Sequence, residues 1–208
     1  MGIDISKIEA IVFDLGGVII NLYEERTYEA FAELGSMPVE EVKEKALTEK
    51  YFKDYETGHI DDPTFRAHLR ESLRFEGQDE FLDEAWNAML GAIPKAKLEL
   101  LDKLRSKYKL FVMSNTNTIH VRRFLKICDY VSPEKDFYGY FDKVYLSNEV
   151  GARKPDARAW QVILDEQPIS VEGMIFIDDK LVNIQAASEL GFQVYHNRQP
   201  DDWMKFFE

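Results

Sequence analysis

The sequence predicts an α/β fold, a doubly wound parallel sheet that carries a small all-helical insertion. From about residue 97 to residue 196, short runs of continuous apolar residues alternate with helical patterns, which is typical of buried strands covered by helices. The stretch 22–94 breaks this rhythm, because it is charged, rich in Glu and helical in pattern. The length of 208 residues suits a core domain with a modest insertion.

Four short apolar runs are predicted to be strands buried on both faces, and a weaker fifth run follows Gly191. The predicted strands cover residues 11–13, 110–113, 144–146, 174–177 and 192–195. Between them, apolar residues recur every three or four positions, as on the buried face of a helix. These stripes are Leu98, Leu101 and Leu104, then Trp160, Ile163 and Leu164, and finally Ile184, Ala187 and Leu190.

The insertion contains two further apolar stripes, and both indicate helices. One consists of Phe65, Leu69 and Leu73, and the other of Phe81, Ala85 and Met89. We therefore predict a core domain of residues 1–21 and 95–208 and a helical domain of residues 22–94. Ordinary helices packed on the sheet are the alternative, but the insertion is far longer than a crossover connection requires.

The composition excludes several classes of partner. The chain has 26 Lys and Arg against 38 Asp and Glu, and its net charge of −12 repels nucleic acid and anionic membranes. The single cysteine, Cys128, permits neither an internal disulfide nor a thiolate metal cluster. The sequence shows no signal-peptide pattern and no apolar run near the roughly 18 residues that span a bilayer. We expect a cytoplasmic monomer or homodimer that binds a small molecule.

Polar residues follow three of the predicted strands at their carboxyl ends. Asp14 ends the first run, Ser114 the second, and Asp178 and Asp179 the fourth. Because ligands of open α/β sheets bind at this edge, we expect these side chains around one crevice. Three carboxylates so close repel one another unless a cation lies between them, and all-oxygen ligands suit Mg²⁺. The sequence therefore predicts a magnesium site.

Two features beside these strand ends suit an anionic ligand. Gly16 and Gly17, two and three residues after Asp14, permit a tight turn and a close approach of the backbone. Lys154 is the obvious counter-charge for an anion inside an acidic protein. Each residue alone also fits a role as a turn, a helix cap or a surface charge, so the indication comes from their combination and order.

Four segments in this order resemble the motifs of the haloacid dehalogenase-like (HAD) hydrolases, over essentially the whole chain. The segments are residues 13–18 for motif I, 113–115 for motif II, 153–155 for motif III, and 176–179 with Asn183 for motif IV. The resemblance implies a Rossmann-like HAD core and makes the insertion a C1-type cap. Longer stretches, among them 114–117 with His120, look most similar to bacterial α-D-glucose-1-phosphate phosphatases, which implies a small phosphorylated metabolite, a sugar phosphate, as substrate.

The resemblance also implies a mechanism for a Mg²⁺-dependent phosphatase. Asp14 is the nucleophile and forms an aspartyl-phosphate intermediate. Ser114, the backbone of Asn115 and Lys154 hold the oxygens of the phosphoryl group. Further candidates for substrate binding are Asn117 and His120.

The metal ligands follow from the same resemblance. Mg²⁺ is held by the Asp14 carboxylate, the Gly16 carbonyl and Asp179, with Asp178 as the fourth candidate nearby. Asn183 is expected to orient either Lys154 or the metal ligands.

One position departs from the family pattern. Most phosphatases of the family carry Asp two residues after the nucleophile, where it protonates the leaving oxygen, and here that position is Gly16. Losing a general acid costs on the order of 10²–10⁴ in rate. Three outcomes are open: turnover is slow, another residue such as His120 or a cap side chain supplies the proton, or the leaving group needs little help. A sugar-1-phosphate fits the third outcome, because its leaving hydroxyl is more acidic than an ordinary alcohol.

Two other functions compete with this interpretation. A catalytically weak or silent phosphate-binding paralog is favoured only by Gly16, whereas Asp14 and Lys154 favour catalysis. A metal-free haloacid dehalogenase uses the same nucleophile, but Asp178 and Asp179 argue against it because such an enzyme has no metal to hold.

Overall fold

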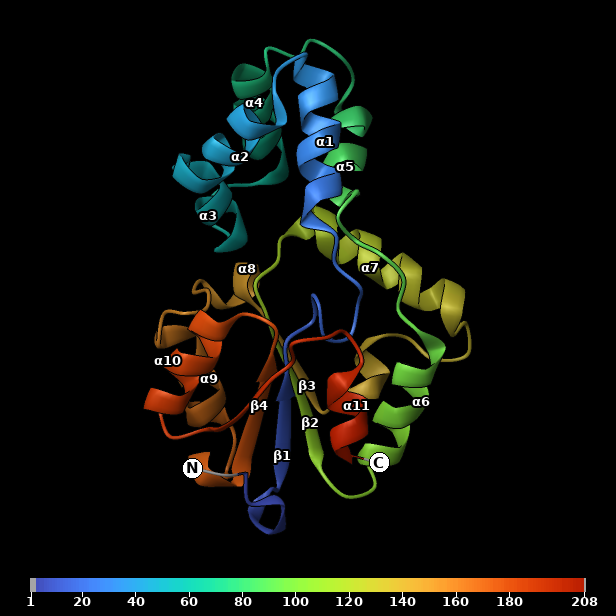
Figure 1. The fold of residues 1–208 in the computed structure, drawn as a ribbon, viewed down its shortest axis with the longest axis vertical. Helices are drawn as coiled ribbons and strands as arrows, with labels where there is room; N and C mark the ends of the chain where they lie inside the picture. Colours follow the sequence, from blue (N-terminus) through green and yellow to red (C-terminus); the bar gives the residue numbers. More distant parts are fainter. Residues whose placement is uncertain (1–2, 208) are drawn as a thin grey trace.

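A computed structural model describes residues 3–207 and shows a parallel five-stranded sheet (Figure 1). Its strands are β1 (Ala10–Phe13), β2 (Lys109–Ser114), β3 (Lys143–Leu146), β4 (Met174–Asp178) and β5 (Gln193–His196). Their order across the sheet is β3-β2-β1-β4-β5, and each neighbouring pair is parallel. The predicted α/β fold is confirmed, with β1 as the central strand. Residues 1, 2 and 208 of the predicted core lie outside the described residues.

Side chains of the inner strands alternate between two apolar clusters, one on each face of the sheet. In β1, Ile11 and Phe13 belong to one cluster, and Ala10 and Val12 belong to the other. β2 and β4 divide their residues in the same way. Because both faces are covered, both sets of side chains are buried, and the runs read as continuously apolar.

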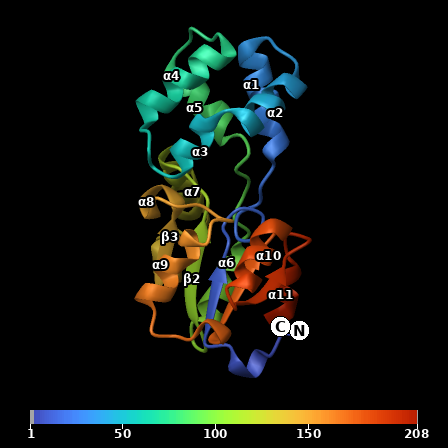
Figure 2. The same ribbon diagram turned by 90° about the vertical axis from the view of Figure 1, so that its left-hand side faces the viewer.

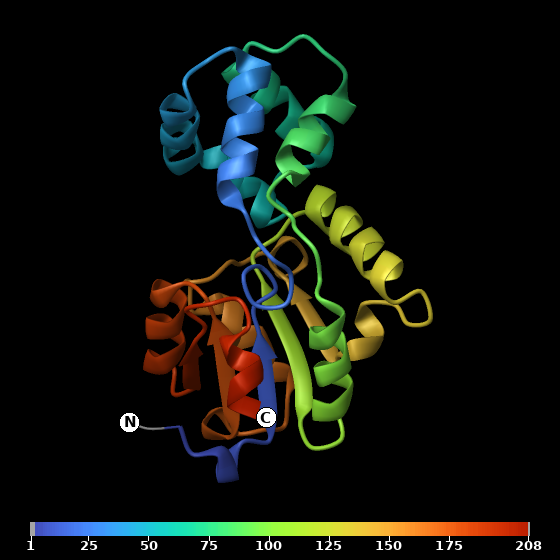
Figure 3. The same cartoon turned by 45° about the vertical axis from the view of Figure 1, so that its right-hand side comes forward.

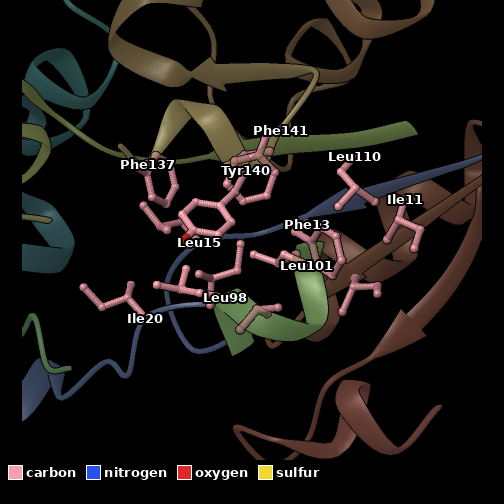
Figure 4. Packing of buried hydrophobic residues seen from close by; sticks show 14 of the residues in the cluster. Ile11, Phe13, Leu15, Ile20, Leu98, Leu101, Leu110, Phe137, Tyr140 and Phe141 are labelled. Carbon is pink, nitrogen blue, oxygen red and sulfur yellow. The ribbon is translucent and has the colours of Figure 1, made fainter. Parts of the chain in front are cut away.

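Helices cover both faces of the sheet (Figure 1). On one face lie α6 (Lys95–Leu104), α7 (Thr118–Val131) and α11 (Asp202–Phe207), and on the other α9 (Arg158–Glu166) and α10 (Leu181–Glu189). Figure 4 shows Leu98 and Leu101 of α6 packed in the same cluster as Phe13. The shorter elements are α8 (Ser147–Val150) and the 3-10 turns η1 (Ile5–Lys7), η2 (Tyr138–Tyr140) and η3 (Val171–Gly173). Among residues 3–207, no helix combines the length and apolar character needed to cross a membrane.

Five helices lie between β1 and α6, and together they are called the cap below. They are α1 (Glu24–Gly35), α2 (Val39–Thr48), α3 (Lys50–Glu56), α4 (Asp62–Leu73) and α5 (Asp79–Asn87). They share an apolar cluster separate from those of the sheet, in which Phe65 stacks on Tyr55 with ring centroids 4.1 Å apart. Figure 2 shows the cap beyond one end of the sheet.

The predicted apolar face of α5 is wrong in part. Phe81 is 55% exposed, and Met89 lies beyond the end of the helix. The buried face instead consists of Leu82, Ala85 and Trp86. The other cap stripe is confirmed, because all three of its side chains are buried in α4.

Two chain segments connect the cap to the sheet, and they run side by side (Figure 3). The backbone N–H of Asn21 donates to the carbonyl of Ala92 (3.0 Å), and the N–H of Gly91 donates back to the carbonyl of Asn21 (2.8 Å). Tyr23 and Met89 add a further backbone bond of 2.8 Å. This pairing places the cap above the carboxyl ends of the strands.

Candidate active site

Three strand ends that carry polar residues are neighbours at one edge of the sheet. β1 pairs with β2 on one side and with β4 on the other. Asp14 follows β1, Ser114 closes β2 and Asp178 closes β4. Parallel pairing brings the three carboxyl ends together although their residues are far apart in the chain.

Lys154 lies between two carboxylates at this edge. Its Nζ atom is 2.8 Å from Asp14 Oδ1 and 2.7 Å from Asp178 Oδ2, and its side chain is 1% exposed. Burial by itself lowers the pKa of Lys154, but the two carboxylates outweigh burial and raise the pKa above its usual value. Lys154 therefore carries a positive charge directly beside the predicted nucleophile.

Asp178 is fully buried, and both of its oxygens already accept hydrogen bonds. Oδ1 accepts from the backbone N–H of Lys180 at 2.7 Å and from Asn183 Nδ2 at 3.1 Å. Oδ2 accepts from Lys154 Nζ at 2.7 Å and from Asn183 Nδ2 at 3.0 Å. Asn183 thus reaches Lys154 through Asp178, and the carboxylate of Asp178 has little capacity left for a metal.

The loop after β2 is tied to the segment that carries Lys154. Asn115 Nδ2 donates to the Lys154 carbonyl at 2.9 Å, and the backbone N–H of Lys154 donates to Asn115 Oδ1 at 2.8 Å. In the same loop, the N–H of Thr116 donates to Ser147 Oγ at 2.9 Å. These bonds hold the end of β2, including the buried Ser114, in a fixed position relative to Lys154.

The acidic side chains at this edge lie close enough to share one cation. Oxygens of Asp14, Asp178 and Asp179 lie within 4.8 Å of one another. Asp179 Oδ1 is buried and has no hydrogen-bond partner among the described residues, which is costly unless a cation takes that place. The Gly16 carbonyl also accepts no hydrogen bond within residues 3–207. The oxygens of Asp14, Asp179 and Gly16 fit a hard divalent cation such as Mg²⁺, whereas those of Asp178 already accept hydrogen bonds.

Gly17 allows Asp179 to approach the backbone after β1. Its φ angle is 72°, in the left-handed region that favours glycine. A Cβ atom at this position would lie 2.8 Å from Asp179 Cγ and 2.8 Å from Asp179 Oδ2. Any side chain at residue 17 therefore displaces the carboxylate with the unpartnered oxygen.

Without a metal, the acidic cluster disfavours the charged form of Asp14. Burial raises the pKa of Asp14 to about 7, Lys154 opposes this rise, and the charges of Asp178 and Asp179 add to it. A carboxyl group attacks as a nucleophile only when it is ionised. A divalent cation held by this cluster would supply positive charge and favour the ionised form of Asp14.

A cavity of about 540 Å³ lies between this edge and the cap. Its core lining includes Asp14, Gly16, Ser114, Asn115, Lys154 and Asp179, and its cap lining includes Tyr28, Phe52, Lys53 and Glu56. Two ion pairs join the cap and the core beside it: Arg153 Nε is 2.6 Å from Glu56 Oε2, and Lys180 Nζ is 2.9 Å from Glu24 Oε1. The cavity is thus lined by polar and charged groups of both the core and the cap.

The family model of the haloacid dehalogenase-like hydrolases matches residues 8–191. The chain belongs to this family. The predicted motifs of this HAD hydrolase thus lie within the matched region, and the order of its strands places them at one edge of the sheet.

The HAD hydrolase is similar to relatives from Bacteroides thetaiotaomicron over nearly its whole length. It is 29% identical over 196 residues to a D-ribitol-5-phosphate phosphatase, a match that covers 94% of this chain and 95% of that protein. A solved HAD family enzyme from the same species, in complex with magnesium and inorganic phosphate, superposes with a TM-score of 0.87 at 35% identity. The superposition covers 97% of this chain and 100% of that chain.

A dehalogenase shares the fold at greater distance. The L-2-haloacid dehalogenase from Xanthobacter autotrophicus superposes with a TM-score of 0.60 at 16% identity, covering 91% of this chain and 77% of that chain. At this identity the likeness shows a common fold only.

Asn117 and His120 of the HAD hydrolase make contacts that differ from the predicted substrate binding. Asn117 Oδ1 caps α7 by accepting the backbone N–H of His120 at 3.1 Å, and it also accepts Trp86 Nε1 at 3.3 Å. The Asn117 amide lies 3.2 Å from His120 Nδ1, and His120 Nε2 donates to the Trp86 carbonyl at 3.0 Å. The two side chains use their polar atoms to join α7 to the cap, so the described contacts give no support to a substrate role.

His120 is also unsuited to replace the missing general acid. Burial lowers its pKa to about 4, so the ring is neutral near pH 7. The proton on Nε2 is held by the Trp86 carbonyl, and the ring stacks on the Trp86 indole with centroids 4.6 Å apart. Of the three outcomes left open by Gly16, proton donation from His120 is disfavoured.

Several residues around the site were not among the sequence candidates. Arg153 and Glu56 form the ion pair at the cavity wall, and Lys97, Asn197 and Trp203 contact the loop after β1. One signal was available for Lys97, because it lies four and seven residues before Leu101 and Leu104, on the apolar face of α6. The others became visible only from the packing.

Proposed function

We propose that this HAD hydrolase is a Mg²⁺-dependent phosphatase that acts on a small phosphorylated metabolite. The observation that carries the proposal is the placement of Lys154 against Asp14 and Asp178, beside the unpartnered oxygen of Asp179. This arrangement provides a nucleophile, a buried positive charge and a cation site within one cavity. The similarity to a phosphatase and to a magnesium and phosphate complex supports the same conclusion.

In the proposed reaction, Asp14 attacks phosphorus and the bond to the leaving oxygen breaks, which forms an aspartyl-phosphate. Water then attacks phosphorus, releases inorganic phosphate and regenerates the Asp14 carboxylate. Lys154, Ser114 and the Asn115 backbone hold the phosphoryl oxygens in both steps. Asp14, Asp179 and the Gly16 carbonyl would hold Mg²⁺, which would supply positive charge to offset the repulsion between carboxylate and phosphate.

We infer that the substrate is a sugar phosphate or a sugar-alcohol phosphate. The relative that hydrolyses D-ribitol 5-phosphate supports a polyhydroxyl substrate. Charged groups from the cap, Lys53 and Glu56, line the cavity and offer partners to hydroxyl groups. In this proposal residues 22–94 act as the cap that selects the substrate, and residues 1–21 and 95–208 form the core that performs the chemistry.

Metal removal tests the proposal. We expect the purified protein to release phosphate from p-nitrophenyl phosphate and from a panel of sugar and alditol phosphates when Mg²⁺ is present. Excess EDTA should abolish release, and added Mg²⁺ should restore it. Binding of phosphate esters without turnover across the panel would instead identify a silent phosphate-binding protein. Halide release from 2-haloacids in the presence of EDTA would identify a dehalogenase.

Substitution of Gly16 tests how the leaving oxygen is protonated. We expect Gly16→Asp to raise turnover of alkyl phosphates by up to about 10²–10⁴-fold, since a carboxylic acid then stands near the leaving group. Turnover of sugar-1-phosphates should rise less, because their leaving hydroxyl is more acidic. The site can accept the change, since the three atoms nearest to a Cβ atom there all belong to the flexible Leu22 side chain, the closest at 3.2 Å.

The matched control for this experiment is Gly16→Asn, which adds nearly the same volume without an acidic proton. It should leave the ratio between the two substrate classes unchanged. Equal acceleration of both classes by Gly16→Asp would show that leaving-group acidity does not compensate for the missing acid.

A further inference from the structure

The loop after β1 is held in place by three side chains that all lie far from it in the chain. Lys97 Nζ of α6 donates to the Val18 carbonyl at 2.6 Å, and Trp203 Nε1 of α11 donates to the same carbonyl at 3.1 Å. Asn197 Nδ2, after β5, donates to the neighbouring Gly17 carbonyl at 3.0 Å. The three residues are called the loop clamp below.

The members of the loop clamp also support one another. Asn197 Oδ1 accepts the backbone N–H of Trp203 at 3.1 Å, which fixes the start of α11. The Trp203 ring is fully buried and meets Phe13 of β1 edge-on, with centroids 5.0 Å apart. The clamp therefore contacts both the strand that precedes Asp14 and the loop that follows it.

Lys97 is an unusual choice for its position. Its side chain is fully buried, and the carboxylate near its Nζ atom, that of Asp201 at 3.4 Å, belongs to a side chain that is 66% exposed. Burying an ammonium group costs free energy, and an apolar side chain of similar length would fill the same space without that cost. The structure thus shows a buried charge whose closest contact is a carbonyl of the loop after β1.

Within residues 15–18, three of the four carbonyls accept hydrogen bonds and the fourth accepts none among the described residues. The Leu15 carbonyl accepts the N–H groups of Ile19 and Ile20, and the carbonyls of Gly17 and Val18 accept the loop clamp. Between them, the Gly16 carbonyl accepts no bond within the described residues. Hydrogen bonds fix the carbonyls of Leu15 and Gly17, which lie on either side of Gly16 in the chain. The Gly16 carbonyl between them is therefore held in one orientation.

We propose that Lys97, Asn197 and Trp203 are positioning residues for the metal site. By binding the carbonyls of Gly17 and Val18, they fix the orientation of the Gly16 carbonyl and thereby the affinity for Mg²⁺. They touch neither the substrate nor the metal, and they act through the backbone. The inference rests on the proposed function, since it assigns a role at the same Mg²⁺ site.

Binding of Mg²⁺ alone, measured by titration calorimetry, tests the inference without any turnover. We expect Lys97→Met to weaken Mg²⁺ binding by about 10–100-fold, the range found when residues that orient metal ligands are replaced. Trp203→Phe keeps an aromatic ring against Phe13 but removes the N–H donor, and it should weaken binding by a smaller factor. In assays, the Mg²⁺ concentration for half-maximal rate should rise in both variants, with little change in substrate KM at saturating Mg²⁺.

The control is Lys95→Met, which removes an exposed lysine from the same helix and should leave Mg²⁺ affinity unchanged. If Lys97→Met does not fold, the Mg²⁺ affinities of Trp203→Phe and Asn197→Ala test the inference instead. Folded variants that bind Mg²⁺ as tightly as the unaltered protein would overturn the inference while leaving the proposed function intact. An unaltered protein that binds no Mg²⁺ would instead refute the proposed function.

Discussion

Replacing Asp14 with asparagine is expected to abolish phosphate release, with a loss on the order of 10⁴-fold or more. The asparagine amide has nearly the same shape but cannot form the covalent intermediate, so the effect reports chemistry and not packing. Initial rates with p-nitrophenyl phosphate and saturating Mg²⁺ measure the loss. Asp165→Asn, at an exposed position on α9, is the matched control and should retain full activity.

The same substitution is expected to stabilise the metal-free protein at pH 8, by on the order of 1–3 kcal/mol. The pKa of Asp14 is about 7 in the folded protein, above the usual value of 3.8. Ionisation of Asp14 therefore favours the unfolded state, and the loss of folding free energy grows as pH rises from about 4 to 7. The gain from Asp14→Asn should therefore be full above pH 7 and fade as pH falls towards 4, where the carboxyl group is protonated in both states. Denaturant unfolding in EDTA at pH 5 and pH 8 measures the difference. In the activity assay, Mg²⁺-dependent turnover by Asp14→Asn would show that Asp14 is not the nucleophile.

Replacing Lys154 with methionine is expected to damage both catalysis and stability. The buried carboxylates of Asp14 and Asp178 lose the ammonium group that lies within 2.8 Å of each, and breaking such a buried pair costs about 3–5 kcal/mol. Phosphate release should fall by roughly 10²–10³-fold at saturating Mg²⁺, because one charge that stabilises the transferring group is lost. Unfolding in EDTA, compared with unfolding in Mg²⁺, separates the two effects, since the cation should restore part of the lost stability.

Lys143→Met is the control for Lys154, because it removes a lysine from an exposed ion pair with Glu166. Surface pairs of this kind contribute about 0.2–1 kcal/mol, so the control should unfold almost like the unaltered protein. Equal stability of the two variants would mean that the charges of Asp14 and Asp178 are balanced by another group.

The polar edge of the sheet could be predicted because two simple physical patterns coincide there. Strands buried on both faces are recognisable because their residues are continuously apolar. A polar residue at the end of such a strand is expected at the carboxyl edge of the sheet. Asp14, Ser114 and Asp178 were therefore predictable as neighbours before any packing was known. The sheet order confirms the shared edge.

Other parts depend on packing that periodicity cannot resolve. Phe81 and Leu82 are adjacent, and only the contacts of α5 with the rest of the cap decide which of them is buried. The apolar face of α6 includes the position of Lys97, but periodicity does not show that its Nζ atom donates to the Val18 carbonyl. His120 lies near a motif in the sequence, but its ring stacks on the Trp86 indole of the cap. Its Nε2 atom donates a hydrogen bond to the Trp86 carbonyl.

The central position of β1 sets the order in which this protein can become active during synthesis. Both edges of Ala10–Phe13 are filled by strands that the ribosome makes much later, residues 109–112 and 174–177. Until then the segment before Asp14 is an unpaired apolar strand, exposed to association with other nascent chains. Lys154 and Asp179 also emerge late, so a chain arrested before residue 154 has Asp14 but neither of these two groups beside it. The appearance of phosphate release in a translation reaction would thus mark the docking of β4 and the completion of the sheet.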